Sequence, residues 1–189
     1  MKKFLKLVFL AIYLALSVCL LIYLILPGPT SITDFPAMPN SHTSTLSGDT
    51  VQVPNVVAYF SDNYRDFVIP FYSNAYKTKA KLPFDPIRFN YPPQFAYTAI
   101  KDQTQSTYLE ELTYPLRDTL FVNGMEPFTK DGKHRFEGAT LFVHDGEHET
   151  KVTLRFYPSS RIIRILVWGG INASFVVLWL SFRKVILNA

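Results

Sequence analysis

The sequence predicts a membrane protein with two transmembrane helices, one at each end, flanking an extracytoplasmic α+β domain with a small antiparallel sheet. Three observations support this fold class. Two apolar segments lie at the two ends of the chain, all fifteen acidic residues lie between them, and helix-like patterns precede strand-like patterns in the middle. Runs of helices followed by runs of strands are typical of α+β domains.

Charge is distributed unevenly along the chain. Only 18% of the 189 residues are charged, against roughly 25% in an average soluble domain. Thirteen basic residues against fifteen acidic residues remain when six basic residues of the two ends are set aside, namely Lys2, Lys3, Lys6, Arg164, Arg183 and Lys184. A mildly acidic middle lacks the basic surface that binding to a phosphate backbone requires. We therefore expect no nucleic-acid partner.

Both apolar segments have the length of a membrane span. They are FLKLVFLAIYLALSVCLLIYLIL, from Phe4, and RIIRILVWGGINASFVVLWLSFRK, from Arg161. A helix needs roughly 20 apolar residues to cross a bilayer, and only internally bonded backbone is stable there. We predict that residues 1–27 form a basic cytoplasmic tail and the first transmembrane helix. Residues 161–189 should form the second helix and a short tail.

The first segment also resembles a secretory signal in its lysine-rich start. Its apolar run of about 20 residues exceeds the 7–15 usual for a signal, and no small-residue cleavage site follows it. The sequence LSVC around Cys19 differs from a lipoprotein signal because Val18 precedes the cysteine and further apolar residues follow. We expect the segment to remain as a membrane anchor.

Basic residues in the short tails predict the orientation. The N-terminal tail contains Lys2, Lys3 and Lys6, and the C-terminal tail contains Arg183 and Lys184, with no acidic residue in either. Short flanks rich in Lys and Arg stay in the cytoplasm. Both termini should therefore be cytoplasmic, with residues of about 28–160 outside.

The cellular compartment is inferred from what the outer part lacks. The single cysteine, Cys19, lies inside the first span, and the one Asn-x-Ser/Thr match, Asn172–Ser174, lies inside the second. Disulfides and N-glycosylation sites are common in eukaryotic secretory domains. We therefore predict an integral protein of the bacterial cytoplasmic membrane.

Between the spans, residues 28–53 are rich in Ser, Thr and Pro and predict an irregular tether. Residues 54–160 predict the folded domain. An aromatic stripe at helical spacing, beginning at Phe60 and ending at Phe71, predicts a helix that Pro70 ends or kinks. Pro92 and Pro93 suit the start of another helix.

The next segment leaves two alternatives open. Thr107 and Glu110 fit a capping box that begins a short helix closed by Pro115. One longer helix from Pro93 to Thr113 fits equally. On either helix, the adjacent residues Glu110 and Glu111 would point about 100° apart, so they could not flank one bond as a catalytic pair.

Two strand patterns follow. The first begins at Asp118 and ends at a predicted turn, Asn123–Gly124. The second is a predicted hairpin, in which Leu141 and Val143 alternate on one arm. Val152, Leu154 and Phe156 alternate on the other. Asp145–Gly146 should form the reversal between them.

Candidate chemistry in the outer part is sparse. His144 and His148 are weak candidates for metal ligands, because His-x3-His is a helical spacing for zinc whereas this stretch predicts a turn. The sequence contains no glycine-rich phosphate loop and no GxSxG elbow. We predict no catalytic residues and no cofactor.

The spans carry the candidate binding residues. Small residues spaced four apart allow close helix approach, and a membrane amide needs a hydrogen-bond partner. The predicted helix–helix interface comprises Gly169, Gly170, Asn172, Ala173, Ser174, Ala11 and Ala15. Packing of the two spans on each other and packing on a different membrane protein are both open. Arg161 and Arg164 should contact lipid headgroups or a partner.

These observations favour a non-catalytic, membrane-anchored accessory, assembly or scaffold subunit of a membrane protein complex. Its partners would be membrane lipid and another integral membrane protein or further copies of itself, bound partly through an extracytoplasmic domain. The alternative is an envelope enzyme or a sensor-like ligand-binding domain, with a site assembled from residues distant in sequence.

Overall fold

The computed structural model describes residues 2–47, 49, 53–101 and 105–188. The chain divides into two compact units. One combines the two ends, Met1–Leu26 and Ser159–Ala189, and the other is the central domain Pro27–Pro158. Two long apolar helices therefore flank a central domain, as the sequence predicts, and that domain is built on an antiparallel sheet.

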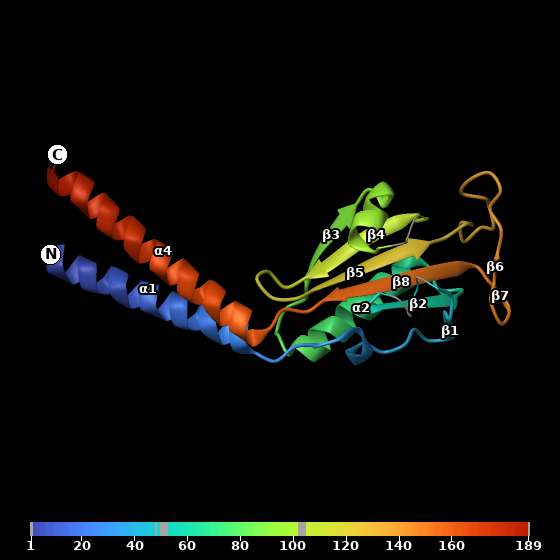
Figure 1. Cartoon of the computed structure of the whole chain (residues 1–189), viewed down its shortest axis with the longest axis horizontal. Helices are drawn as coiled ribbons and strands as arrows, with labels where there is room; N and C mark the ends of the chain where they lie inside the picture. Colours follow the sequence, from blue (N-terminus) through green and yellow to red (C-terminus); the bar gives the residue numbers. More distant parts are fainter. Residues whose placement is uncertain (1, 48, 50–52, 102–104, 189) are drawn as a thin grey trace. The chain divides into compact units, whose positions relative to one another are not determined.

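The terminal unit is a pair of helices, α1 (Lys2–Ile25) and α4 (Arg161–Asn188). Within them, Phe4–Ile25 and Arg161–Val185 are long and apolar enough to cross a membrane. Most of their large apolar side chains are exposed rather than buried in the protein. The N- and C-termini lie at the same end of the pair (Figure 1), so the helices run antiparallel.

The central domain is organised around a six-stranded sheet in the order β1-β2-β8-β5-β4-β3, with every neighbouring pair antiparallel. The strands are β1 (Ser41–Thr43), β2 (Val56–Ser61), β3 (Ile87–Tyr91), β4 (Tyr108–Thr113), β5 (Thr119–Met125) and β8 (Thr150–Tyr157). Directly opposite residues share a face of a sheet. Val122 lies between Leu154 and Glu110, so these three side chains lie on one face.

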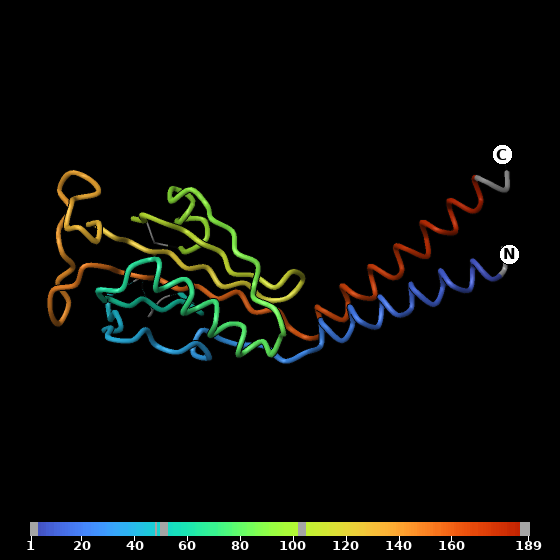
Figure 2. The backbone as a smooth tube through the Cα atoms, turned by 180° about the vertical axis from the view of Figure 1, so that it is seen from behind, coloured from blue at the N-terminus to red at the C-terminus, as the bar shows by residue number. Residues whose placement is uncertain are grey.

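Helix α2 (Arg65–Ala80) covers that face. Its Tyr76 lies fully buried against Tyr114 and Phe156, with ring centroids 4.9 Å and 6.2 Å away. Figure 2 shows α2 running along the strands in the view from behind. Pro70 lies inside this helix rather than ending it, since the buried residues that follow at helical spacing hold the helix on the sheet.

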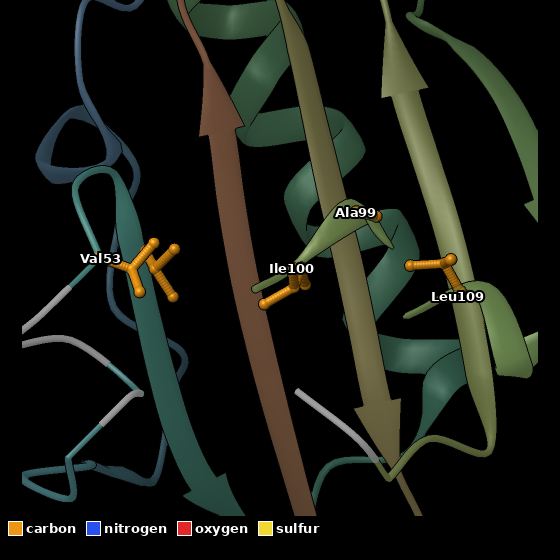
Figure 3. Packing of buried hydrophobic residues seen from close by; sticks show 5 residues of the cluster. Val53, Ala99, Ile100 and Leu109 are labelled. Carbon is orange, nitrogen blue, oxygen red and sulfur yellow. The ribbon is translucent and has the colours of Figure 1, made fainter. Parts of the chain in front are cut away.

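The opposite face carries a smaller core, made of Val53, Val56, Ala99, Ile100 and Leu109. Figure 3 shows labelled members of this cluster in front of the strands, with α2 behind them. The cover comes from a short 3-10 helix, η2 (Pro93–Phe95), and the single turn α3 (Ala96–Ala99). The prolines do precede helical structure, but it ends at Ala99, so the longer helix to Thr113 is wrong.

Two segments predicted as helix are strands. Phe60 belongs to β2, and the helix expected from it starts only at Arg65. Thr107 immediately precedes β4 instead of capping a helix. Both strands are buried on both faces, between α2 and the smaller core. Their alternation of polar and apolar residues is therefore lost, and the pattern imitates a helix.

The predicted hairpin also pairs differently. A reversal does occur at Asp145–Gly146, where both residues have positive φ. The returning arm is the short β7 (Glu147–His148), paired with β6 (Phe142–Val143), while β8 pairs with β2 and β5. Asn123–Gly124 lies within β5 and makes no turn.

The segment predicted as a tether is ordered where the structure describes it. It contains a 3-10 helix, η1 (Ile32–Asp34), and strand β1 at one edge of the sheet. Phe35 is buried and stacks edge-on against Tyr76 and Phe156. Although the segment is rich in Pro, a few of its apolar residues are buried in the core beside α2. Their burial holds the segment against the domain.

Candidate functional site

A charged cleft of about 640 Å³ lies at the start of α2. Side chains from α2, β3, β4 and the segment between β5 and β6 converge on it. The lining residues are Tyr64, Arg65, Asp66, Pro70, Arg88, Thr107, Tyr108, Glu126, Lys130 and Arg135. Four of these residues are basic, namely Arg65, Arg88, Lys130 and Arg135.

A buried carboxylate anchors two of the arginines. Glu110 has no exposed surface, and its register on β4 directs it to the α2 face. Arg65 donates to Glu110 Oε1 through Nε at 2.5 Å. Arg88, on β3, donates to both carboxylate oxygens through Nε and Nη2. The carboxylate lies beneath while the guanidinium groups stay partly exposed, so Glu110 holds two cations at the surface.

A second buried carboxylate caps α2. Glu126 is 3% exposed and accepts a hydrogen bond of 2.6 Å from the backbone N–H of Arg65. Its other oxygen accepts from Arg135 Nη2 at 2.7 Å. A carboxylate at a helix N-terminus satisfies free N–H groups and complements the helix dipole. Glu126 therefore fixes the start of α2 and places Arg135 beside Arg65.

The rim of the cleft carries two perturbed groups. Lys130 donates to the carboxylate of Asp66, and this hydrogen bond lowers the pKa of Asp66 below its ordinary value. Tyr64 donates to Glu149 Oε2 at 2.8 Å. Desolvation, supported by that hydrogen bond, raises the pKa of Tyr64 to about 12. Both rim groups therefore keep their charge state through the neutral pH range.

Tyr108 forms the apolar floor. The guanidinium carbon of Arg65 lies 5.2 Å from the centre of its ring. Burial raises the pKa of the Tyr108 hydroxyl well above its ordinary value. Within the described residues this hydroxyl has no hydrogen-bond partner. A buried hydroxyl without a partner destabilises the folded domain.

We expect Tyr108→Phe to raise the free energy of unfolding by about 1 kcal/mol, because it removes a buried polar group that has no partner. The folded domain keeps this hydroxyl protonated at pH values where the unfolded chain ionises it, above about 10. Wild-type stability should therefore fall more steeply above that pH than the variant's. Urea unfolding of the full chain in detergent, followed by the tyrosine circular dichroism band at pH 7 and 10.5, measures both. A variant less stable than the wild type at pH 7 contradicts the prediction.

The sequence missed this cleft. The sequence pattern places Glu110 and Glu111 side by side on a helix, but on strand β4 they face opposite sides of the sheet. Glu111 accepts a hydrogen bond of 2.6 Å from Tyr91 on the other face. The arginines that meet Glu110 come from segments 22 and 45 residues away. No local spacing predicts such a meeting, and the sequence shows only two adjacent acidic residues, Glu110 and Glu111, among largely apolar neighbours.

The two histidines predicted as weak metal ligands lie on either side of the β6–β7 turn. His148 Nε2 is 3.1 Å from the backbone oxygen of His144. Both rings pack against Phe60, with centroids 4.8 Å and 6.1 Å from its ring. In the part of the chain that the structure describes, no group of three or more His, Cys, Asp or Glu side chains is arranged to hold a metal ion.

Asn172 is at the centre of the contact between α1 and α4. Its side-chain oxygen accepts hydrogen bonds from the hydroxyls of Tyr13, at 2.5 Å, and Ser17, at 2.8 Å. Its side-chain nitrogen donates to the backbone oxygen of Trp168. The Trp168 indole N–H donates in turn to the backbone oxygen of Ser17 at 2.9 Å. The amide thus finds its partners within the helix pair.

The small residues of the predicted interface lie elsewhere. A Cβ atom added to Gly169 or Gly170 would meet no described atom within 4 Å outside its own helix. The remaining members of the set, Ala11, Ala15, Ala173 and Ser174, are exposed in this structure. The face of α1 that meets α4 contains Tyr13 and Ser17 instead, because their hydroxyls satisfy the Asn172 amide. Ala15 lies two positions from both Tyr13 and Ser17, which is a rotation of about 200° around the helix. Ala15 therefore lies on the other side of α1 from these two residues.

The two arginines at the start of α4, which the sequence predicts to contact headgroups or a partner, differ in exposure. Arg161 is exposed, whereas Arg164 is only 5% exposed. Arg164 donates to the Ser159 hydroxyl at 2.7 Å and to the backbone oxygen of Leu24 at 3.4 Å. The last carbonyls of a helix lack internal partners and carry partial negative charge. Arg164 therefore helps to satisfy the C-terminal end of α1, and the contact of both arginines with a headgroup or partner stays a prediction.

We expect Asn172→Leu to destabilise the helix pair by about 1 kcal/mol, as membrane side-chain hydrogen bonds usually contribute. Both tryptophans of the chain lie in α4, so their fluorescence reports unfolding of the pair in mixed micelles as SDS is added. Ala173→Leu is the matched control, since Ala173 is exposed and should tolerate the larger side chain. An equal loss for both variants would contradict a specific role for Asn172.

No protein-family model matches this chain, and no curated protein or solved structure shows a significant match to it. A functional assignment therefore rests on the geometry of the residues themselves.

Proposed function

We propose that this chain is a non-catalytic, membrane-anchored accessory, assembly or scaffold subunit of a membrane protein complex. In this proposal α1 and α4 cross the bacterial cytoplasmic membrane with both termini in the cytoplasm. The central domain, Pro27–Pro158, lies outside and binds a partner protein. The apolar length of both helices and the basic residues in their tails support this arrangement.

The observation that carries the proposal is the outer edge of the sheet at β3. In the described structure β3 pairs only with β4, so its other side is free for a further strand. Ile87 and Phe89 of this strand are 47% and 46% exposed, and Phe95 nearby is 50% exposed. Soluble proteins usually protect such an edge with charges, prolines or a covering element. β3 carries one charge, Arg88, and lies between Pro86 and Pro92, but no described strand pairs with its free side. Exposed apolar side chains such as Ile87 and Phe89 are typical of a surface that a partner covers.

An extended segment of a partner protein fits this edge best. Strand addition supplies main-chain hydrogen bonds along β3, and the exposed Ile87 and Phe89 side chains supply apolar contact. A second copy of this chain, paired through the same strand, would satisfy the edge in the same way and give a homo-oligomer.

The buried acidic residues support a non-catalytic role. Glu110 is fully engaged by Arg65 and Arg88, and Glu126 by Arg135 and the start of α2. A general acid or base must be within reach of a substrate proton. Carboxylates held beneath arginines are instead placed to position those arginines. The cleft favours a ligand-binding role as the second candidate function.

Co-purification tests the proposal. The tagged full chain is extracted from its native membrane in mild detergent and compared with Phe89→Lys, which places a charge on the β3 edge. Val143→Lys is the control, because Val143 is 81% exposed on β6, outside the main sheet. We expect a stoichiometric partner, or a homo-oligomer, that Phe89→Lys loses at least tenfold and Val143→Lys retains. A wild-type chain that emerges alone and monomeric contradicts the proposal.

A further inference from the structure

We infer that the charged cleft at the start of α2 binds a small ligand carrying a phosphate or carboxylate group. This inference does not rest on the partner proposed for the free edge of β3, although one cleft residue, Arg88, belongs to that strand. It rests on three observations. The basic side chains are more exposed than the carboxylates that pair with them, those carboxylates fix the orientation of the arginines, and the cleft is large enough for a small ligand.

The cationic groups lie nearer to solvent than the carboxylates that neutralise them. The side chains of Arg65, Arg88, Arg135 and Lys130 are 35%, 51%, 39% and 59% exposed. The side chains of Glu110 and Glu126 are 0% and 4% exposed. A ligand that enters the cleft therefore meets guanidinium and ammonium groups first, although the residues around it nearly balance in formal charge. Asp66, at the rim, is the exposed exception.

The buried carboxylates also pre-organise the arginines. A guanidinium has five N–H donors in a rigid planar fork. Arg88 donates to Glu110 through Nε and Nη2, which fixes the plane of the group and leaves the donors of Nη1 outside that pair. Holding donors in place before binding reduces the entropy lost when a ligand arrives. Phosphate and carboxylate are the groups that match such a fork.

The cleft has room for a small organic anion. Its volume of about 640 Å³ lies within the range of small-molecule sites, roughly 300–1,000 Å³. The Tyr108 ring supplies an apolar floor. Either a soluble anion or the headgroup of an anionic lipid has this chemistry.

Calorimetric titration of the full chain in zwitterionic nanodiscs, at low ionic strength, tests the inference. The probes are inorganic phosphate, citrate, and dihexanoyl phosphatidic acid kept below its micelle concentration. Binding of phosphate or citrate supports the site with a soluble ligand as its source. Binding of the short lipid alone supports it with a lipid headgroup as the source. No binding of any probe at millimolar concentration overturns the inference.

Two substitutions locate the binding. Arg88→Gln leaves Glu110 paired with Arg65, and Lys130→Gln removes an exposed ammonium at the rim. Lys133→Gln is the matched control, because Lys133 is exposed on the same segment but does not line the cleft. We expect affinity to fall about tenfold or more for Arg88→Gln and several-fold for Lys130→Gln. The control should stay within a factor of two.

The variants also guard against a folding artefact. Urea midpoints without ligand show whether each variant is folded, and Lys130→Gln should be wild-type in this respect because its side chain is 59% exposed. If Arg88→Gln fails to fold, comparing the ligand affinity of Lys130→Gln with that of Lys133→Gln still tests whether the ligand binds in this cleft. Equal losses of affinity in Lys130→Gln and Lys133→Gln would overturn the assignment of the ligand to this cleft.

Discussion

Removing both arginines from Glu110 is expected to lower the free energy of unfolding of the central domain by about 3–5 kcal/mol, the usual effect of leaving a buried charge without its partners. Glu110 is fully buried between β3 and β5, and Arg65 and Arg88 supply its ion pairs. The double variant Arg65→Met/Arg88→Met keeps two long side chains over the cleft but leaves the carboxylate without compensation. Urea unfolding in detergent, followed by circular dichroism, measures the loss.

A triple variant separates the lost ion pairs from the lost packing. Adding Glu110→Leu to the two methionine substitutions replaces the whole buried charge network with apolar groups. Such replacements are often neutral or stabilising, so the triple variant should recover most of the stability that the double variant loses. A triple variant as unstable as the double variant would show that the charge on Glu110 is not the cause.

Gly124→Ala is the second substitution with a large expected effect. A Cβ atom at Gly124 would lie 2.0 Å from Cζ and 2.4 Å from the hydroxyl of Tyr108, its cross-strand neighbour. The Tyr108 ring is 2% exposed, lies beneath Arg65 and borders the cleft, so a displaced ring would have to push Arg65 aside. Overpacking of a filled core costs about 1–3 kcal/mol and sometimes more. We expect about 3 kcal/mol here, because the added methyl group overlaps the Tyr108 ring and the ring can yield only by displacing Arg65.

The coupling between the two positions provides the check. Tyr108→Val alone should destabilise the domain by emptying the space over Gly124. Combined with Gly124→Ala, it should cost much less than the sum of the two single losses, since the added methyl group then fills part of that space. Unfolding free energies of all four proteins, measured under one set of conditions, give the coupling. Additive losses would contradict the contact between Tyr108 and Gly124.

The sequence predicted the terminal helices well, because long apolar segments with few charges are a strong local signal. The sheet was harder to predict. β2 and β4 are covered on both sides, so neither showed the alternation of a half-exposed strand. In β8 the alternation was clear, but its partners β2 and β5 are determined by packing across the domain, not by the nearest turn.

Residues of the candidate sites show the same division. Asn172 was recognised from its chemistry, since an amide in an apolar helix needs a partner, whereas its partners Tyr13 and Ser17 lie 159 and 155 residues away. Glu110 is visible in the sequence as an acidic residue, but its burial and its arginines follow from the pairing of β3 with β4 and from the packing of α2 on the sheet. The sequence indicates which single residues have unusual chemistry for their surroundings, but only the fold determines which residues come into contact.

Cysteine labelling in intact cells tests most directly whether the chain crosses the membrane twice and leaves the central domain outside. Single cysteines are placed at Lys3, Asp145 and Asn188 in a Cys19→Ser background and exposed to a maleimide that cannot cross membranes. The proposed topology predicts labelling at position 145 in intact cells, and at positions 3 and 188 only after lysis. Labelling of position 3 or 188 in intact cells, with position 145 protected, would contradict it.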